Sequence, residues 1–438
     1  MSFPEKVKSS LWSIIDKMSQ RPGQFAKNPD ADFSRKRKLD FRDLLRLLIS
    51  MQSGTIGHEL LKYFDFKHST ASASAFIQQR GKLLLSAFRF LLRQFNALFP
   101  CKLYRGKYRL TAVDGSEFNI ARNPNDPDSF HPPSGKSTNG FNMIHTTSSY
   151  DLINKRYLDC VVQPGRLKNE FRAICDLADR DDFGGLPVYI GDRGFSSYNF
   201  FAHAKEKGIF HLIRAKDVNV KRLLGLQSLP DSIDTGIEII LTRTQSKKDR
   251  LRPDLDEQYR YISKDVAFDY IEHGSVDEYT LSLRIVRVEV AEGAFVNLIT
   301  NLPPDDVSTE ELKYWYHLRW GIETAFRDLK HTIGAVNFRS KKIEYIEQEI
   351  WARLILFNFC SIIATHLVIA QNDTKHVYQV NFAMALKICH HFIRLKDGEP
   401  PPDVLALIGK FTLPIRADRK FARKRRFQLP AAFCYRFS

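Results

Sequence analysis

Two aspartates beside glycine stand out in the sequence as candidate metal ligands. Asp114 follows the apolar segment 108–113, and Asp192 follows the apolar segment 188–191. Both segments predict strands, and an aspartate at the carboxyl end of a strand points into the crevice where α/β sheets hold ligands. Flanking glycines let backbone and metal approach closely. Either aspartate alone is typical of a turn, but the pair predicts a carboxylate cage for Mg²⁺, which needs hard oxygen ligands from different strands.

A third carboxylate, Glu323, lies in a segment that predicts one long helix over residues 308–333. At about 100° per residue, four polar residues share a stripe about 60° wide: Tyr316, Arg319, Glu323 and Lys330. The adjacent stripe is apolar and is expected to pack on a sheet; it comprises Trp315, Leu318, Ile322, Phe326, Leu329 and Ile333. The alternative interpretation is an ordinary amphipathic helix with surface ion pairs, which contribute little to stability.

Taken together, these side chains describe two-metal phosphodiester chemistry. Three carboxylates can hold two divalent ions, and Arg, Lys and Tyr side chains can bind phosphates. In that chemistry one ion activates water or a 3′-hydroxyl group, and the other stabilises the leaving oxygen. The combination favours a functional site over an ordinary amphipathic helix.

The elements expected around these residues make a mixed α/β sheet. Residues 1–100 read as helices, whereas from Lys107 the apolar period becomes strand-like. Three strands are followed by helix, strand, helix and strand up to Ala215. The segments between 217 and 303 are β-rich and separated by charged turns, which predicts an all-β insertion. Helices resume at Ser308, which is placed to cap the first of them.

These changes of pattern divide the chain of 438 residues into five parts. They are an N-terminal helical domain (1–100), the first part of an α/β domain (101–216), a β-rich insertion (217–303), the second part of the α/β domain with the Glu323 helix (304–372), and a helical C-terminal region with a basic tail (373–438).

The charge balance favours an anionic partner. The formal net charge is +16, and the phosphate backbone of a nucleic acid is the commonest such partner. Two basic runs, 35–38 and 416–426, suit either phosphate contacts or a solvated surface. The start of the chain lacks the apolar run of a signal peptide, and the six cysteines are scattered, so a cytoplasmic protein with reduced cysteines is expected. The apolar stretch Leu354–Ala370 is interrupted by polar residues and predicts a buried helix rather than a membrane span.

The polar stripe also carries a family resemblance. Tyr316-x2-Arg319-x3-Glu323-x6-Lys330 resembles the YREK signature of bacterial DDE transposases of the insertion-sequence-four family. Asp114-Gly115-Ser116 is similar to the first Asp motif of that family, and Asp192-Arg193-Gly194-Phe195 is similar to the second. The order of the motifs and the β-rich segment before the glutamate agree with this resemblance.

The resemblance implies a ribonuclease-H-like catalytic domain that is split by the β insertion and preceded by an N-terminal helical DNA-binding domain. It implies Asp114, Asp192 and Glu323 as catalytic residues that hold two Mg²⁺ ions per active site, with Mn²⁺ able to substitute. It also implies that the partner is DNA, and that a homodimer pairs two inverted-repeat ends in a synaptic complex.

The same resemblance implies phosphate contacts near the cleaved end from Tyr316, Arg319 and Lys330. Arg193, inside the second Asp motif, is expected either to contact DNA or to pair with a carboxylate. Some family members excise through a DNA hairpin, with a tryptophan of the insertion stacking on a flipped base. The insertion here has no tryptophan, and the aromatic residues that could stack instead are Tyr259, Tyr261, Phe268 and Tyr270.

The function expected from these motifs is cut-and-paste DNA transposition. Water would attack first, and the freed 3′-hydroxyl group would then attack target DNA. Two alternatives stay open. One is a metal-dependent nuclease on the same fold, and the other is a catalytically inactive, domesticated DNA-binding protein.

Overall fold

The structure is a computed structural model of the whole chain. It describes residues 1–51, 54–134, 137–246, 248, 250–334, 338–369, 377–396 and 398–415. The basic run 416–426 and the end of the expected apolar helix, beyond residue 369, lie outside the described residues.

One sheet of ten strands forms the centre of the molecule, in the order β2-β3-β1-β5-β6-β10-β9-β7-β8, with β4 paired to β3. Strands β1 (Tyr108–Ile120), β5 (Leu186–Gly191) and β6 (Phe210–Ala215) run parallel to one another. Strand β3 (Phe141–Asp151) is antiparallel to β1, and both β4 (Arg156–Pro164) and β2 (Phe130–His131) are antiparallel to β3. The five strands β4, β3, β1, β5 and β6 confirm the expected ribonuclease-H-like mixed sheet.

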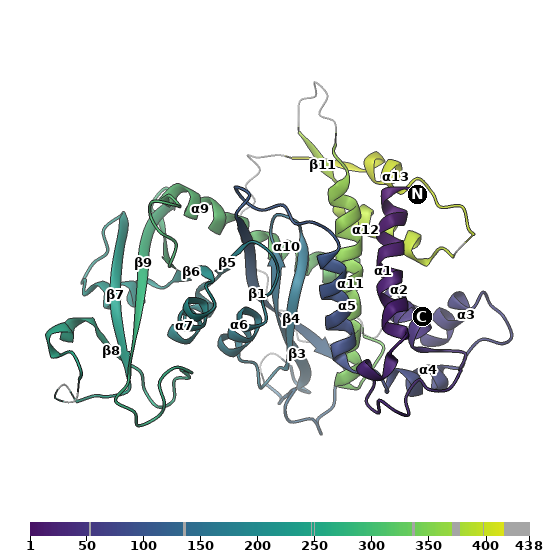
Figure 1. Cartoon of the computed structure of the whole chain (residues 1–438), viewed down its shortest axis with the longest axis horizontal. Coiled ribbons are helices and arrows are strands. Elements are labelled where there is room, and N and C mark those ends of the chain that lie inside the picture. Colours follow the sequence, from purple (N-terminus) through teal and green to yellow (C-terminus); the bar gives the residue numbers. More distant parts are fainter. Residues whose placement is uncertain are drawn as a thin grey trace.

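The segment 217–303 takes a different form from the expected all-β insertion. It begins with a helix, α8 (Asp217–Leu224), and it also contains the short helix η4 (Pro253–Gln258). Its strands are β7 (Ile233–Thr242), β8 (Tyr259–Tyr261), β9 (Glu278–Ala291) and β10 (Ala294–Thr300). Because β10 pairs with β6, these strands continue the central sheet, and they form its outer end at the left of Figure 1.

Helices cover the two faces of the sheet. Helices α6 (Glu170–Asp179) and α7 (Tyr198–Glu206) share a core with Val113 of β1. The neighbouring residue Ala112 belongs to the core on the other face, with the long helix α11 (Ile343–His366). This division follows from strand geometry, because successive side chains point to opposite faces.

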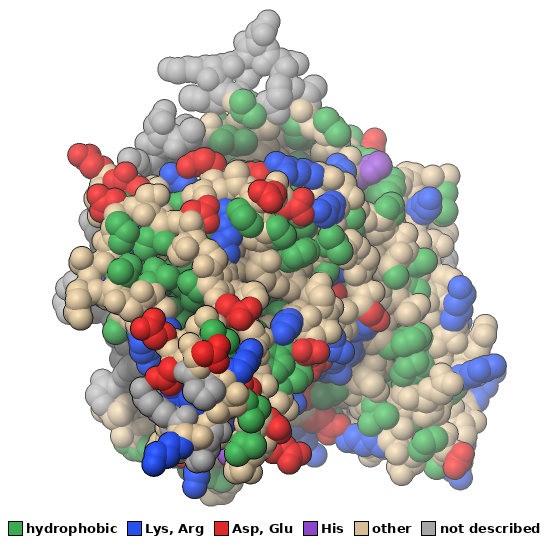
Figure 2. All heavy atoms as spheres, turned by 60° about the vertical axis from the view of Figure 1, so that its left-hand side comes forward, with side chains coloured by type: hydrophobic (Ala, Val, Ile, Leu, Met, Phe, Trp, Pro, Cys, Tyr) green, Lys and Arg blue, Asp and Glu red, His purple; other side chains and the backbone are tan. Residues whose placement is uncertain are grey.

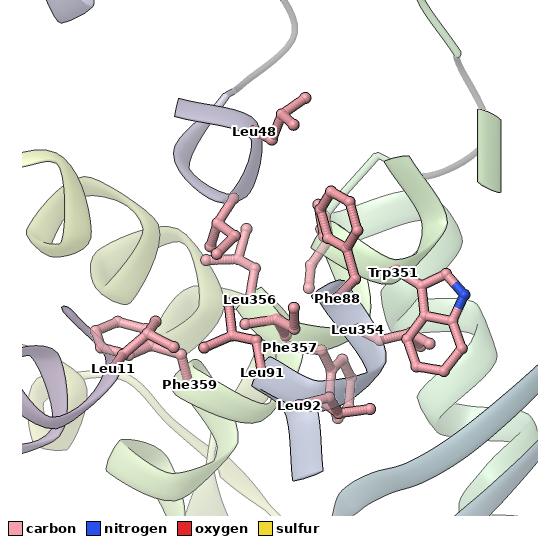
Figure 3. Close-up of a cluster of buried hydrophobic side chains, with 14 of the residues drawn as sticks. Leu11, Leu48, Phe88, Leu91, Leu92, Trp351, Leu354, Leu356, Phe357 and Phe359 are labelled. Atoms are coloured by element: carbon pink, nitrogen blue, oxygen red, sulfur yellow. The ribbon is translucent and has the colours of Figure 1, made fainter. Parts of the chain in front are cut away.

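The N-terminal helices do not form a core of their own. They are α1 (Phe3–Ser19), η1 (Pro22–Phe25), α2 (Phe41–Ser50), α3 (Ile56–Tyr63), α4 (Ala73–Arg80) and α5 (Leu85–Ala97). Their apolar side chains share one core with α11 and α12 (Phe382–Arg394), and Figure 3 shows Leu11 and Phe88 in the same cluster of buried side chains as Phe357 and Phe359 of α11. The division expected at residue 100 is therefore a change of secondary structure within one packed unit, and the DNA-binding role of the first 100 residues stays a prediction.

Helix α11 confirms the expectation of a buried apolar helix. Nineteen of its residues are buried, from Tyr345 to Ala364. In the part of the chain that the structure describes, no helix is long and apolar enough to cross a membrane. The C-terminal region continues with α12, α13 (Val404–Lys410) and a two-stranded sheet of β11 (Tyr378–Val380) and β12 (Thr412–Pro414).

Candidate active site

Strand register places the two candidate aspartates side by side. The parallel pairing of β1 with β5 ends at Val113 and Gly191, so that Asp114 and Asp192 are the next residue of each strand segment. The pairing of β5 with β6 ends at Gly191 and Ile213, which puts Arg214 in the same row. The two aspartates thus lie beside each other at the carboxyl end of the β1–β5 pairing, while the crevice expected there stays a prediction.

The expectation that Asp114 ends its strand was wrong. Strand β1 runs on to Ile120, because β3 pairs with it along this whole stretch, with Asp114 opposite Ser148. Only the parallel partner β5 stops beside Asp114. Asp114 therefore lies on a strand that is still hydrogen-bonded to β3 on one side but no longer paired with β5 on the other.

The single helix expected over 308–333 is divided into three pieces. They are α9 (Thr309–Leu318), α10 (Trp320–Arg327) and a π-helical turn, η5 (Asp328–Thr332). Ser308 caps α9 as expected, and its side chain accepts a hydrogen bond from the Glu311 N–H. The apolar stripe is buried as expected, except for Leu318, which is half-buried at the break.

Arg319, at the break between α9 and α10, lies between two of the three carboxylates. Its Nη2 is 2.9 Å from Glu323 Oε1, and its Nη1 is 3.7 Å from Asp114 Oδ2. The side chain is buried, with its guanidinium near the rings of Tyr316 and Trp320. The predicted grouping of Asp114, Arg319 and Glu323 is therefore present in the structure.

Tyr316 and Arg214 both contact Asp192, the third of the carboxylates. The Tyr316 hydroxyl donates to Asp192 Oδ1 at 3.3 Å, and Arg214 Nη1 is 3.6 Å from the same oxygen. Burial, followed by the charge of Asp192, raises the pKa of Tyr316, so the phenol keeps its proton. Arg214 was not among the residues predicted from the sequence, because its place beside Asp192 depends on the pairing of β5 with β6.

The other two predicted phosphate ligands lie farther from the carboxylates. Lys330 Nζ donates to the backbone oxygen of Glu117 at 2.8 Å and covers the Phe118 ring, both on β1 beyond Asp114. Arg193 is exposed in the turn η2 (Arg193–Phe195) and makes no hydrogen bond or ion pair within the described residues. The structure thus brings Lys330 to the same strand edge as Asp114 but leaves Arg193 facing solvent.

Asp114, Asp192 and Glu323 concentrate negative charge where the pairing of β1 with β5 ends. The pKa of Asp114 is raised to about 6, chiefly by burial and also by the charges of Glu323 and Asp192, while the Gly115 N–H and Arg319 act to lower it. Hard oxygen donors with excess negative charge suit a divalent cation. As arranged, no three His, Cys, Asp or Glu side chains of the described residues could together hold a metal ion. Arg319 instead supplies a positive charge between Asp114 and Glu323.

A mixed sheet with two aligned aspartates, a glutamate on the helix that covers them, and cations at the same edge defines a DDE-type domain. The chain belongs to the transposase DDE domain family, because the model of that family matches residues 105–359, which are more than half of the chain. The resemblance to DDE transposases of the insertion-sequence-four type is thereby confirmed, while the correspondence of the four-residue helix motif stays a prediction.

Several insertion-sequence transposases are similar to this chain. The transposase for IS231D of Bacillus thuringiensis subsp. finitimus is 22% identical over 387 residues, covering 80% of this chain and 76% of that protein. The transposase InsG for IS4 of Escherichia coli K12 is 29% identical over 119 residues, or 25% of this chain and 26% of that one. The putative transposase InsL for IS186A of the same strain is 40% identical over 73 residues, so the match spans only 20% of its length.

Among solved structures, the chain is similar to a piggyBac transposase in a synaptic complex with hairpin DNA, determined by cryo-electron microscopy. The sequences are 12% identical and the TM-score is 0.40, over 95% of this chain and 87% of the other.

Proposed function

We propose that this protein is a DNA transposase that cleaves DNA at inverted-repeat ends and joins the freed 3′-hydroxyl group to target DNA. The observation that carries the proposal is the row of Asp114 and Asp192 on adjacent parallel strands, linked to Glu323 through Arg319. Such an edge gathers the oxygen ligands and the phosphate-binding cations that phosphodiester chemistry needs.

In this proposal Asp114, Asp192 and Glu323 hold two Mg²⁺ ions, for which Mn²⁺ can substitute. The ions supply activation of the attacking oxygen and stabilisation of the leaving oxygen. Arg319 turns from the carboxylates to the DNA phosphate at the cleaved end. Tyr316 keeps its proton at neutral pH, because its pKa is raised by burial, and it can donate a hydrogen bond to a phosphate oxygen. Lys330 and Arg193 contact neighbouring phosphates.

The partner in this proposal is DNA, bound by a homodimer that pairs two ends in the cytoplasm. The net charge of +16 supports a polyanionic partner. On the face in Figure 2, where the outer end of the sheet comes forward, Lys and Arg side chains are interspersed with Asp and Glu side chains. The net charge is therefore not gathered into one basic patch on that face.

The test is strand transfer by the purified full chain on DNA that carries the inverted repeats flanking its own gene. We expect joined products with Mg²⁺ or Mn²⁺, no products with EDTA, and a loss of at least about 10³-fold for Asp192→Asn. Asp231→Asn, at an exposed position before β7, is the matched control and should keep full activity. Cleavage without joining would identify a nuclease, and binding of these ends without cleavage would identify an inactive DNA-binding protein.

A further inference from the structure

The two faces of β1 carry different parts of the site. Asp114 points to the face covered by α10 and α11, where it meets Arg319. Gly115 is the next residue, so its α-carbon hydrogen points to the opposite face, which α6 covers. What lies against Gly115 is therefore directly behind the first catalytic aspartate.

A carboxylate and an imidazole fill that position. Glu170, the first residue of α6, places its Oε1 3.2 Å from Nε2 of His145 on β3. The contact with His145 lowers the pKa of Glu170, so this group is a carboxylate at neutral pH. His145 is 2% exposed, and its Nδ1 has no hydrogen-bond partner among the described residues.

Only glycine leaves room for this pair. A Cβ at position 115 would overlap Glu170 Oε1, and it would stand 2.6 Å from Cε1 and 2.8 Å from Nε2 of His145. A Cβ at Gly194, which follows Asp192 by two residues, would lie 3.7 Å from Glu170 Oε2, at ordinary contact distance. One oxygen of the Glu170 carboxylate thus fills the space where a side chain at position 115 would begin, and the other faces the turn that follows Asp192.

We propose that Glu170 and His145 are positioning residues, which set the separation of Asp114 and Asp192 by holding the backbone at Gly115 and Gly194 from behind the sheet. This inference rests on the proposed function for its catalytic consequence. The pair contacts neither DNA nor a metal ion, and it acts through the two strand segments whose register aligns the aspartates.

The Glu170 side chain is 30% exposed where it meets the buried His145. A contact between a partly exposed carboxylate and an imidazole contributes little to stability. A fixed distance between two carboxylates, in contrast, directly controls the affinity for a divalent ion. Outer partners that orient metal-binding groups typically change affinity or activity by about 10–100-fold when they are removed.

The experiment measures Mn²⁺ binding by isothermal titration calorimetry together with kcat and KM for strand transfer. We expect Glu170→Ala to weaken Mn²⁺ binding and to lower kcat by about 10-fold or more, with an unchanged KM for DNA. Glu170→Gln keeps the shape of the side chain and should recover most of the loss. Circular dichroism and thermal unfolding establish that each variant is folded.

A double-mutant cycle separates this role from a general loss of packing. Gly115→Ala should cost at least as much as Glu170→Ala, because the new Cβ displaces the carboxylate. Combining the two should cost less than the sum of the single losses, since Glu170→Ala removes one of the two groups that the Cβ would strike. Gly236→Ala on β7, where a Cβ meets nothing within 4 Å, is the control and should bind Mn²⁺ as the wild type does.

The inference is overturned if folded Glu170→Ala binds Mn²⁺ with wild-type affinity, or if the wild type binds no Mn²⁺ at the three carboxylates. The inference would also be overturned if the losses of Mn²⁺ affinity in Gly115→Ala and Glu170→Ala were additive in the double variant. Failure of the proposed function looks different, because a wild type that binds Mn²⁺ but joins no DNA contradicts transposition, whereas the calorimetric comparison still tests the positioning role.

Discussion

Arg319 is the residue whose surroundings most constrain the site. It pairs with Asp114 and Glu323 and is buried beside the rings of Tyr316 and Trp320. Two carboxylates this close would otherwise repel each other, so a cation between them stabilises the site without metal. If these carboxylates bind a divalent ion, as we propose, the same cation competes with it for their oxygens.

We therefore expect Arg319→Ala to have opposite effects on two measurements. Mn²⁺ affinity in the absence of DNA should rise about 3- to 10-fold, because the competing cation is removed, an energy of about 1 kcal/mol. Strand transfer should fall at least about 100-fold if Arg319 also binds the DNA phosphate. Calorimetry and a strand-transfer assay measure the two effects. Arg319→Lys is the control that keeps the charge, and a drop in Mn²⁺ affinity for Arg319→Ala would contradict the competition.

A second prediction at this scale concerns His390, on α12. Burial lowers the pKa of this imidazole to about 3, and its Nε2 is 3.2 Å from the Ser50 carbonyl oxygen, which joins α12 to α2. In the unfolded chain the pKa is about 6.5. Between pH 6.5 and pH 3 the unfolded chain therefore binds more protons than the folded one, so that the free energy of unfolding falls as the pH is lowered through this window.

From pH 7.5 to pH 5 this single group should lower the free energy of unfolding by about 2 kcal/mol. His390→Gln can still donate to Ser50 and does not titrate, so it should lose correspondingly less stability over the same range. Urea unfolding at the two pH values measures the difference. His391, the exposed neighbour, supplies the control variant His391→Gln. Equal pH slopes for His390→Gln and the wild type would refute the assignment.

At the scale of elements, α11 is positioned by a polar residue inside its apolar surface. Asn358 is fully buried, and its Oδ1 accepts a hydrogen bond from the Tyr157 N–H on β4 at 2.8 Å. Its Nδ2 donates to the backbone carbonyl oxygen of Tyr157 and to Asn96 Oδ1 on α5. The Asn358 side chain thus links α11 to both β4 and α5.

Asn358→Leu should lower the free energy of unfolding by about 2–4 kcal/mol. The loss arises because the N–H and oxygen of Tyr157 and the amide of Asn96 are left buried without this partner. Thermal and urea unfolding measure it. Ser361→Ala, one turn along the same helix, removes a single side-chain contact to the Lys155 oxygen and should cost only about 1 kcal/mol. A variant Asn358→Leu as stable as the wild type would show that apolar packing alone docks α11.

For the whole molecule, the shared core predicts that the N-terminal 100 residues and the rest of the chain fold together. Arg80 of α4 illustrates the connection, since it is 2% exposed and pairs with Gln348 and Glu349 of α11. Separating the two parts would expose the apolar surface of α11 to water.

A chain limited to residues 101–438 should therefore aggregate, or show a broad, non-cooperative thermal transition in circular dichroism. Co-expression with residues 1–100 should restore a soluble complex with a cooperative transition. The outcome that contradicts one shared core is a fragment 101–438 that is soluble and unfolds cooperatively at the temperature of the full chain.

The sequence alone predicted the mixed sheet, which is confirmed, and it singled out the three carboxylates, the tyrosine and the arginine of the helix stripe, whose catalytic and binding roles stay predictions. These follow from local patterns, namely strand and helix periods and the residue types at fixed spacing. The break at Arg319 could not be predicted from the helical pattern, because the backbone there keeps helical dihedral angles and the apolar stripe continues across it.

Only the tertiary structure decided which distant residues join this set. Arg214 stands in the row of Asp114 and Asp192 through the pairing of β5 with β6, and Glu170 lies behind Gly115 because α6 packs on the opposite face. The core shared by the N-terminal helices and α11 is equally non-local. Register between strands and docking between helices depend on contacts between segments far apart in the chain, and a one-dimensional pattern specifies which face of an element is buried but not what covers it.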